Sequence, residues 1–343
     1  MSPRLPAEWE PQSGLLLTWP HPATDWRNNL AGVEAVFMEI VRHTANNQSV
    51  IIACHNNEHA EHVGNQLREL HLPAGSWRIF IAPSNDSWAR DHGPITVMDN
   101  HSPLLLDFEF NGWGGKYPAE LDNRITQTLH RAGALGNTTL QHCTVVLEGG
   151  SIETDGHGTL LVTTSCLLSP QRNGNMNKAQ IEMKLRKLLG AKRILWLNHG
   201  HLQGDDTDGH IDTLARFVNP ETIVHVATDN PGNPDFRELK LMAGELAELQ
   251  RADGRYYQLI TLPVPQLKNP DGLPLPASYA NFLLVNHAVL VPLYQVPDDD
   301  RALAILDDCF PDHSIIGINC RPLIEQCGSL HCVTMQLPAG VIP

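Results

Sequence analysis

Short apolar segments rich in valine, isoleucine and leucine recur along the whole chain and predict many strands. They include GLLLTW, SVIIAC, WRIFIA, LLLDFEF, GTLLVTT, TIVHVA, NFLLV and SIIGI. Between them, apolar residues recur every three or four positions, as on one face of a helix. Such faces predict helices around 30–41, 58–71, 125–132, 176–189, 234–250 and 298–309. The chain is therefore expected to be of the mixed α/β class.

The order of these segments predicts a repeated unit of strand, strand, helix and strand. Similar segments open the successive units: RDHGPITV, LEGGSIET, DGHIDTLA, PASYANFL and SLHCVTMQ. One polar residue marks each of them, and neighbouring markers are 51 to 71 residues apart: Asp91, Glu148, His210, Asn281 and Cys332. If the units close into a ring, these equivalent strand starts meet at one end of the central axis. The pattern thus predicts one pocket built from distant parts of the chain.

The marker residues have the chemistry of a catalytic site. In DGHIDT, His210 and Asp212 are two positions apart, so in a strand they would face the same side and could either bind a metal or transfer protons beside a bound cation. Asp91 precedes Gly93 and Pro94, which indicate a tight turn that exposes the carboxylate at a strand start. Glu148 follows an apolar run and precedes two glycines, an arrangement that favours close approach of the backbone around a carboxylate.

Cys332 can be either a buried space-filler or a nucleophile, and a lone cysteine does not decide between them. A thiol reacts as the thiolate, which a nearby cation favours. A guanidinium group is such a cation, because it is planar, permanently charged and suited to paired carboxylates. Three carboxylates, a histidine and a cysteine at equivalent positions therefore fit hydrolysis of a guanidine.

Composition narrows the possible partners. With 42% hydrophobic residues, the 343-residue chain can bury a large core, and no apolar run has the length of a membrane span or a signal peptide. The formal charge of −14 argues against nucleic acid and anionic membranes and favours a cationic ligand. The seven cysteines form no CxxC pair, which favours reduced thiols and a cytoplasmic location.

The chain also resembles a known family over nearly its whole length. The motifs LPAEWEPQSGLLLTWPH, NDSWARDHGP, NGWGGKY, LEGGSIETDGHGTLLVT, GDDTDGHID, LPASYANF and LHCVTMQ are similar, in the same order, to those of the agmatine deiminase and bacterial peptidylarginine deiminase family. These are guanidine-modifying enzymes, whose fold is a five-bladed α/β propeller, the pentein fold. The resemblance implies a single catalytic domain over residues 1–343.

The resemblance also implies a role for each matching residue. Cys332 corresponds to the nucleophile and His210 to the general acid and base, while Glu148 would orient His210 through a hydrogen bond. Asp91 and Asp212 would hold the guanidinium nitrogens. Trp88 and Trp113 lie in the matching motifs and either wall the pocket or belong to ordinary packing. The resemblance implies no metal or organic cofactor, and family members are often homodimers.

The preferred substrate is agmatine, which would yield N-carbamoylputrescine and ammonia on the way to putrescine. Free or peptidyl arginine is the nearest alternative. A metal-dependent amidohydrolase built around His199, His201, His210 and Asp212 is a more distant one, and a guanidine-binding protein without turnover is a non-enzymatic one. The segment EQCGS departs from the glycine-rich run expected before His331 and Cys332, and it brings in Cys327 as a second oxidisable thiol.

Overall fold

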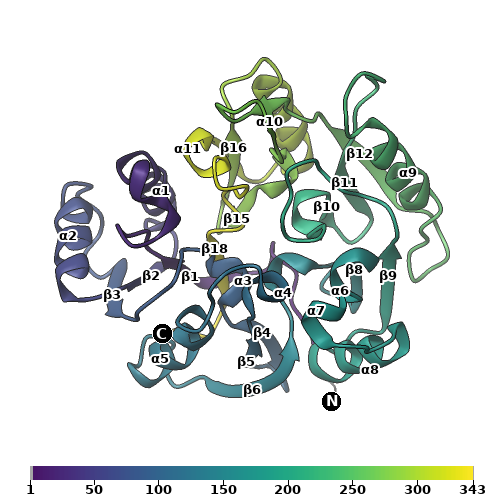
Figure 1. Cartoon of the computed structure of the whole chain (residues 1–343). Helices are drawn as coiled ribbons and strands as arrows, with labels where there is room; N and C mark the ends of the chain where they lie inside the picture. The colour runs from purple at the N-terminus through teal and green to yellow at the C-terminus, as the bar shows by residue number, and fades with distance from the viewer. Residues whose placement is uncertain (1–2, 343) are drawn as a thin grey trace.

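The computed structural model describes residues 3–342 and shows five sheets arranged in a ring around a central axis (Figure 1). Four sheets have three strands each and one has four, and a separate two-stranded hairpin lies between β12 and β15. We number the sheets as blades 1 to 5. The predicted five-bladed α/β propeller is thus the observed architecture.

Blades 2 to 5 repeat one pattern. The first two strands are antiparallel, a helix follows, and the third strand runs parallel to the second. Blade 2 contains β4 (Ile95–Asp99), β5 (Ser102–Glu109), α5 (Ile125–Arg131) and β6 (Thr139–Val146). Blade 3 contains β7 (Ile152–Thr154), β8 (Thr159–Thr163), α8 (Lys178–Leu189) and β9 (Arg193–Leu197). Blade 4 contains β10 (Ala215–Asn219), β11 (Thr222–Val226), α9 (Phe236–Ala247) and β12 (Gln258–Leu262). Blade 5 contains β15 (Leu283–Val285), β16 (Ala288–Leu293), α10 (Asp299–Cys309) and β17 (Ser314–Asn319).

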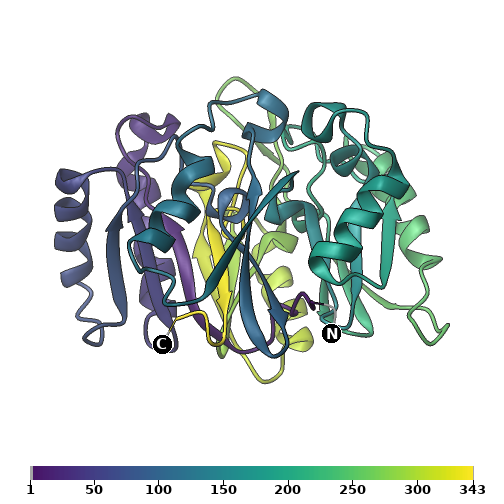
Figure 2. The ribbon, with the colours of Figure 1, turned by 90° about the horizontal axis from the view of Figure 1, so that it is seen from below.

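Blade 1 joins the two ends of the chain. Its strand order is β18–β1–β2–β3, and β18 pairs antiparallel with β1. The elements are β18 (Thr334–Pro338), β1 (Gln12–Thr18), α1 (Leu30–Thr44), β2 (Ser49–Cys54), α2 (Asn57–Arg68) and β3 (Trp77–Ile81). Figure 2 shows the first and last described segments on the same face of the ring. The hairpin strands are β13 (Leu267–Lys268) and β14 (Pro274–Leu275).

The helices form where the apolar spacing predicts them. Helix α1 buries Val33, Phe37 and Ile40 on one face. Helix α8 begins at Asn177, whose side chain accepts a hydrogen bond from the Gln180 amide in a capping box, and it ends at Gly190, which has a φ of 69°. Asn175 and Asn177 are both suited to cap a helix at this point of the sequence, and the structure uses Asn177. No helix in the described residues is long and apolar enough to cross a membrane.

One-turn helices, rather than strand starts, carry four of the five marker residues. They are α3 (Ala89–His92), η3 (Gly149–Ser151), η4 (Ile211–Thr213) and η5 (Tyr279–Asn281). Asp91 lies within α3, Glu148 caps η3, His210 caps η4 and Asn281 ends η5. Neighbouring turns contact one another from α3 through η3 and η4 to η5, and α3 also contacts β18. The turns therefore form an inner ring at one end of the axis.

The prediction that His210 and Asp212 share one face of a strand is wrong. Residues Ile211–Thr213 form a 3-10 turn, and β10 begins only at Ala215. The Thr213 hydroxyl donates a hydrogen bond to the His210 carbonyl at 2.9 Å, and the Thr213 amide donates to the same oxygen at 3.4 Å. Such local bonds from a threonine compete with a strand ladder and close a turn. The expected strand starts at Asp91 and Glu148 are replaced by turns in the same way, because β4 begins at Ile95 and β7 at Ile152.

Candidate active site

The inner ring brings all the predicted catalytic side chains together. Asp91, Glu148, His210 and Asp212 are buried, and Cys332 is only 9% exposed. A methyl group placed on Gly150 would lie 2.6 Å from His210 Nδ1, 3.0 Å from Asp91 Oδ1 and 3.1 Å from an Asp212 oxygen. Three groups from two inner turns, α3 and η4, thus converge on one glycine of a third turn, η3, which has no side chain that would fill the space between them.

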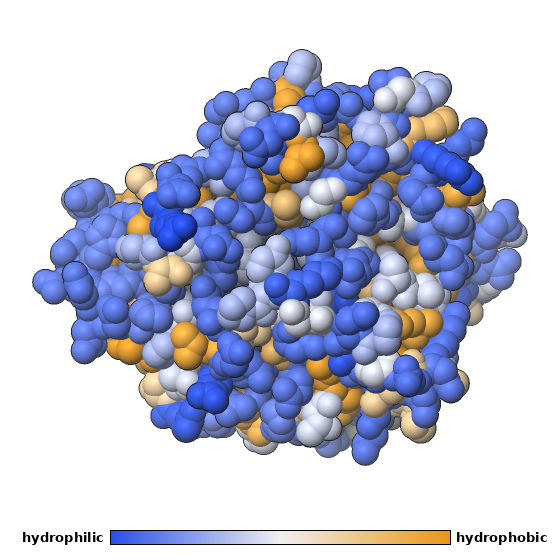
Figure 3. All heavy atoms as spheres, viewed as in Figure 1, coloured by the Kyte–Doolittle hydropathy of each residue, from blue (hydrophilic) through white to orange (hydrophobic). Residues whose placement is uncertain are grey.

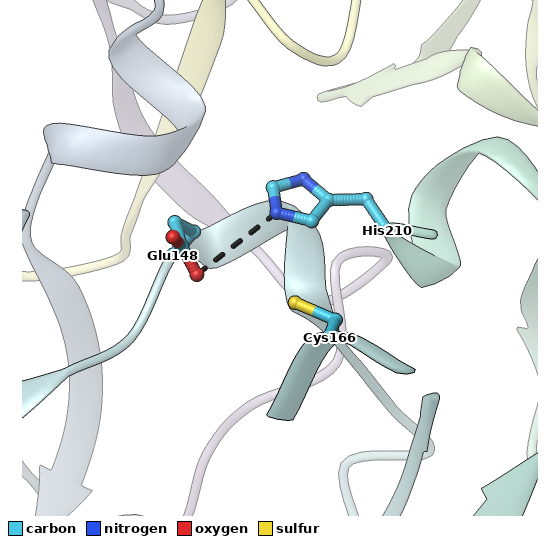
Figure 4. A group of neighbouring side chains, drawn as sticks. All are labelled: Glu148, Cys166 and His210. Carbon is cyan, nitrogen blue, oxygen red and sulfur yellow. Dashed lines mark ion pairs between the residues drawn. The ribbon is translucent and has the colours of Figure 1, made fainter. Parts of the chain in front are cut away.

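His210 lies between two carboxylates. Its Nδ1 is 3.7 Å from Asp91 Oδ1, and its Nε2 is 4.0 Å from Glu148 Oε2 (Figure 4). Burial lowers the pKa of His210, but Asp91, the nearby Cys166 thiol and Glu148 outweigh it and raise this pKa well above its usual value. Among the described residues, Nε2 has no hydrogen-bond partner. The ring is therefore held as a proton donor with one nitrogen open.

Asp91 is held by two donors. Trp113 Nε1 donates to Oδ2 at 3.0 Å, and the Gly150 amide donates to Oδ1 at 3.1 Å. Burial raises the pKa of Asp91, His210 opposes this and the negative charges of Asp212 and Glu148 add to it, so that the pKa is raised to about 6. A carboxylate in this position gains from a cation placed beside it.

Asp212 offers an open oxygen. Its Oδ2 is 2.7 Å from His331 Nδ1, whereas its buried Oδ1 has no hydrogen-bond partner among the described residues. Burial raises the pKa of Asp212, but the hydrogen bond from His331 and the charges of His331, His210 and Arg216 bring it below its usual value. An ionised buried carboxylate with an unsatisfied oxygen is expected to attract a donor from a ligand.

The Cys332 thiol lies against Asn281. Its Sγ is 3.4 Å from Asn281 Oδ1, an oxygen that also accepts from the backbone amides of His331 and Cys332 at 3.0 and 3.4 Å. Burial raises the pKa of Cys332 well above its usual value, and the charges of Asp212 and Asp91 raise it further. The sulfur is thus a neutral thiol until positive charge enters the site.

Sequence reasoning missed Arg172, which holds Glu148 in place. Arg172 comes from the short helix α7 (Pro170–Asn173), and its Nε lies 2.9 and 3.0 Å from the two carboxylate oxygens of Glu148. The guanidinium also donates to Asp208 Oδ2 at 2.6 Å and to the Thr207 carbonyl at 2.7 Å. Arg172 therefore links Glu148 to the loop that precedes His210. Its segment, SPQRNGN, is polar and aperiodic, so no pattern in the sequence marks it.

Two histidines of the metal-dependent alternative, His199 and His201, do not join the site. His199 Nδ1 contacts Glu238 at 3.2 Å and His201 Nδ1 lies 3.8 Å from Asp205, with side chains 38% and 51% exposed. Among residues 3–342, one group of possible metal ligands has its atoms within 4.8 Å of one another, namely Glu148, Cys166 and His210 (Figure 4). The Arg172 guanidinium already occupies both oxygens of Glu148, so this group does not fit a metal ion without displacing a buried cation.

A pocket of about 240 Å³ leads from the surface to Asp91 and Cys332. Trp88, Trp113 and Tyr117 provide aromatic walls, with the Trp88 and Trp113 ring centroids 6.4 Å apart in an edge-to-face arrangement. Its other charged lining residues are all aspartates: Asp25, Asp86, Asp122 and Asp206. The described lining contains no lysine, arginine or histidine. Figure 3 shows the face of the ring that carries α4 (Gly112–Gly115), and hydrophilic side chains cover most of it.

The segment before Cys332 forms one side of this pocket. Gln326, Cys327 and Gly328 line it, and Cys327 has a φ of 62°. A side chain at Gly328 would overlap the Trp88 ring, since its first carbon would lie 2.0 Å from that ring. Asn29 donates a hydrogen bond to Glu325 at 3.0 Å. The segment EQCGS, which stands in place of the expected glycine-rich run, therefore packs against Trp88 and is hydrogen-bonded to Asn29 at the start of α1.

The comparison with known families decides the assignment. Residues 4–338 match the family model of the Porphyromonas-type peptidyl-arginine deiminases. The chain belongs to this family. An agmatine deiminase of Pseudomonas aeruginosa is 31% identical, over 98% of this chain and 95% of that protein.

Solved structures of family members have the same fold. A structure of C. jejuni agmatine deiminase, in a cysteine-to-serine variant with substrate bound, is 34% identical over 98% of this chain and 96% of the other, with a TM-score of 0.90. A Porphyromonas gingivalis protein, provisionally described as an arginine deiminase, is 46% identical over the full length of both chains, with a TM-score of 0.93. The family thus includes members named for different guanidine substrates.

Proposed function

We propose that the protein hydrolyses the guanidinium group of agmatine to N-carbamoylputrescine and ammonia. The observation that carries this proposal is a buried thiol beside two carboxylates, reached through a pocket whose other charged lining residues are all acidic. Agmatine has a positive charge at both ends, so one end suits Asp91 and Asp212 and the other suits the outer aspartates. We also propose that the whole ring acts as one catalytic domain over residues 1–343.

Each side chain has one role in the proposed reaction. Asp91 and Asp212 hold the guanidinium nitrogens, Cys332 is the nucleophile and His210 is the general acid and base. Glu148 orients His210, and Trp88 and Trp113 form the walls against which the planar cation lies.

The proposed mechanism has two halves. When the cation binds, its charge lowers the pKa of Cys332 and the thiol loses its proton to solvent. The sulfur then bonds to the guanidinium carbon, one terminal C–N bond breaks, and ammonia leaves with a proton from His210. In the second half, His210 takes a proton from water, whose oxygen adds to the same carbon of the S-alkylthiouronium intermediate. The C–S bond then breaks, the added oxygen loses its remaining proton to solvent and becomes the carbonyl oxygen of the product, and Cys332 returns as the thiolate.

The acidic pocket distinguishes agmatine from arginine. Free arginine carries an α-carboxylate, which would face Asp25, Asp86 or Asp206 with no lysine or arginine in the described lining to balance it. Like charges placed together cost several kcal/mol. A peptidyl arginine has no free ammonium group at the end opposite its guanidinium, so it cannot form an ion pair with these aspartates. The lining therefore favours a substrate with a second positive charge at the end opposite the guanidinium.

Ammonia release from agmatine, arginine and an arginyl peptide tests the proposal. We expect kcat/KM for agmatine to exceed the other two by at least about 100-fold, the factor that corresponds to unfavourable charge placement of this size. If the peptide alone released ammonia, the deiminase chemistry would hold and the agmatine assignment would be wrong. No ammonia from any of the three compounds would overturn both.

We expect the carboxylates of the pocket to set the acid limb of the pH profile, with Asp91 at the reacting end, because burial also raises the pKa of Asp86 to about 6 and that of Asp122 to about 7. The pKa of Asp91 is raised to about 6, and the protonated acid has no negative charge for a guanidinium. We therefore expect kcat/KM for agmatine to fall about tenfold per pH unit below about pH 6, because this parameter reports ionisations of the free enzyme. Initial rates in constant-ionic-strength buffers would measure the limb. A profile that stayed flat to about pH 4 would contradict the raised pKa, which burial causes.

Two predictions from the sequence extend the proposal. We propose a cytoplasmic setting, supported by the absence of a disulfide among the described cysteines, all seven of which are free. We also propose that the protein forms a homodimer, as the family resemblance implies. Size-exclusion chromatography with light scattering measures that state directly.

A further inference from the structure

The histidine that precedes the reactive cysteine lies between two buried carboxylates. His331 Nδ1 is 2.7 Å from Asp212 Oδ2, and His331 Nε2 is 2.8 Å from Glu8 Oε1. The imidazole is buried, and its backbone amide donates to Asn281 at 3.0 Å. Both ring nitrogens are therefore engaged, so the ring is not available to take a proton from Cys332.

Glu8 is a fixed anchor for this arrangement. It lies in the segment before β1, and the guanidinium groups of Arg216 and Arg90 contact its two oxygens at 2.5 and 3.2 Å. Gln336 in β18 donates to it at 2.9 Å. The charges of Arg216, His331 and Arg90 hold the pKa of Glu8 well below its usual value in spite of burial. The anchor is thus an ionised carboxylate that cannot turn freely.

The contact on Asp212 determines which oxygen remains open. Oδ2 accepts from His331 and is also the oxygen that approaches the point near Gly150 where His210 and Asp91 meet, so the same contact fixes the carboxylate there and leaves Oδ1 without a partner among the described residues. Without the imidazole, no side-chain hydrogen bond would keep the Asp212 carboxylate from rotating about its Cβ–Cγ bond. With Glu8 and Asp212 both ionised, the two nitrogen–oxygen contacts together need two protons on the His331 ring. Burial and the charges of Arg216 and Arg90 lower the pKa of His331, and the contacts with Glu8 and Asp212 oppose this shift.

We propose that His331 is a positioning residue that locks Asp212 for guanidinium binding, with Glu8 fixing the imidazole from the other side. This inference rests on the proposed function, because it concerns the binding of a guanidinium group. The ring acts through Asp212 and does not touch the reacting atoms. Its effect should therefore appear first in substrate affinity.

Two amide substitutions separate the two nitrogens of the ring. The amide of His331→Asn reaches approximately the place of Nδ1 and can still donate to Asp212. The amide of His331→Gln reaches approximately the place of Nε2 and can contact only Glu8. In a Cys332→Ala background, which prevents turnover, we expect the Gln variant to raise the Kd for agmatine by about 10- to 100-fold, the factor for losing a hydrogen bond to a charged group. The Asn variant should stay within about threefold.

Calorimetric titration with agmatine measures these Kd values, and kcat/KM of the same variants with Cys332 intact should follow the same ranking. The matched control is His225, a buried histidine in β11, whose replacement by Asn or Gln should leave the Kd unchanged. Equal Kd values for the two His331 variants would overturn the positioning role. If the parent protein bound arginine but not agmatine, the proposed substrate would fail, and the same comparison with arginine would still test His331.

A second measurement covers variants that do not fold. In the intact protein labelled with ¹⁵N-histidine, the Nδ1 of His331 should carry a proton with the downfield shift of a hydrogen bond to a carboxylate. That signal should persist when agmatine is added. An unprotonated Nδ1 in the presence of agmatine would overturn the proposal.

Discussion

Replacing Cys332 by alanine is expected to reduce ammonia release from agmatine by at least about 10⁴-fold, because the covalent route needs the sulfur and no other thiol lies in its place. The other six cysteines are free, but Cys327 is the only one of them that lines the pocket in the described residues. Agmatine should still bind to the variant, since Asp91 and Asp212 remain. Initial-rate assays and calorimetry on the same preparation would show loss of turnover with binding retained.

Cys54 provides the control for this substitution. It is fully buried in β2, and burial raises the pKa of its thiol to about 12. Cys54→Ala removes a buried sulfur without touching the pocket, so it should lower thermal stability and leave kcat near the parent value. Substantial ammonia release by Cys332→Ala would exclude the covalent mechanism and would indicate direct attack by water on the guanidinium carbon.

Replacing Arg172 by methionine is expected to lower the free energy of unfolding by about 3–5 kcal/mol, because it leaves the buried Glu148 carboxylate without its cation. Glu148 and the Arg172 side chain are fully buried, and Nε contacts both carboxylate oxygens. Activity should fall as well, since Glu148 lies 4.0 Å from His210 and would no longer be held. Urea unfolding followed by circular dichroism would measure the loss of stability.

A double variant separates the two effects of Arg172. Adding Glu148→Gln to Arg172→Met removes the unpaired charge, so part of the lost stability should return while activity stays low. Arg186→Met is the matched control. Arg186 pairs with Glu182 at 3.5 Å on the surface of α8, and such exposed pairs contribute about 0–1 kcal/mol. Equal losses of unfolding free energy for Arg172→Met and Arg186→Met would show that the buried pair contributes no more to stability than the exposed one.

The sequence was sufficient to predict the ring and the residues that meet at its centre. Strands and helices alternate with a loose period, and one polar residue opens each unit, so the pattern predicts a ring of units and the gathering of Asp91, Glu148, His210 and Cys332 at one end of its axis, while the five-bladed propeller came from the family resemblance. The roles of these residues came from the family resemblance and stay predictions until the variants are measured.

The supporting residues could not be predicted, because their partners are distant in the chain and their segments have no pattern. Arg172 lies 24 positions from Glu148, and Glu8 lies 323 positions from His331. A charged residue that will be buried looks the same in sequence as one on the surface. The alternation of apolar and polar residues also carries no information on local hydrogen bonds, so it predicts a strand where Thr213 closes a turn.

The pairing of β18 with β1 has a consequence for assembly of the site. The strand that follows Cys332 pairs with the strand that opens the ring, so blade 1 is complete only when both strands are present. A polypeptide that stops before Cys332 would still contain Asp91, Glu148, His210 and Asp212 but would lack this thiol and β18. We therefore expect such a fragment to be inert toward guanidines rather than partly active.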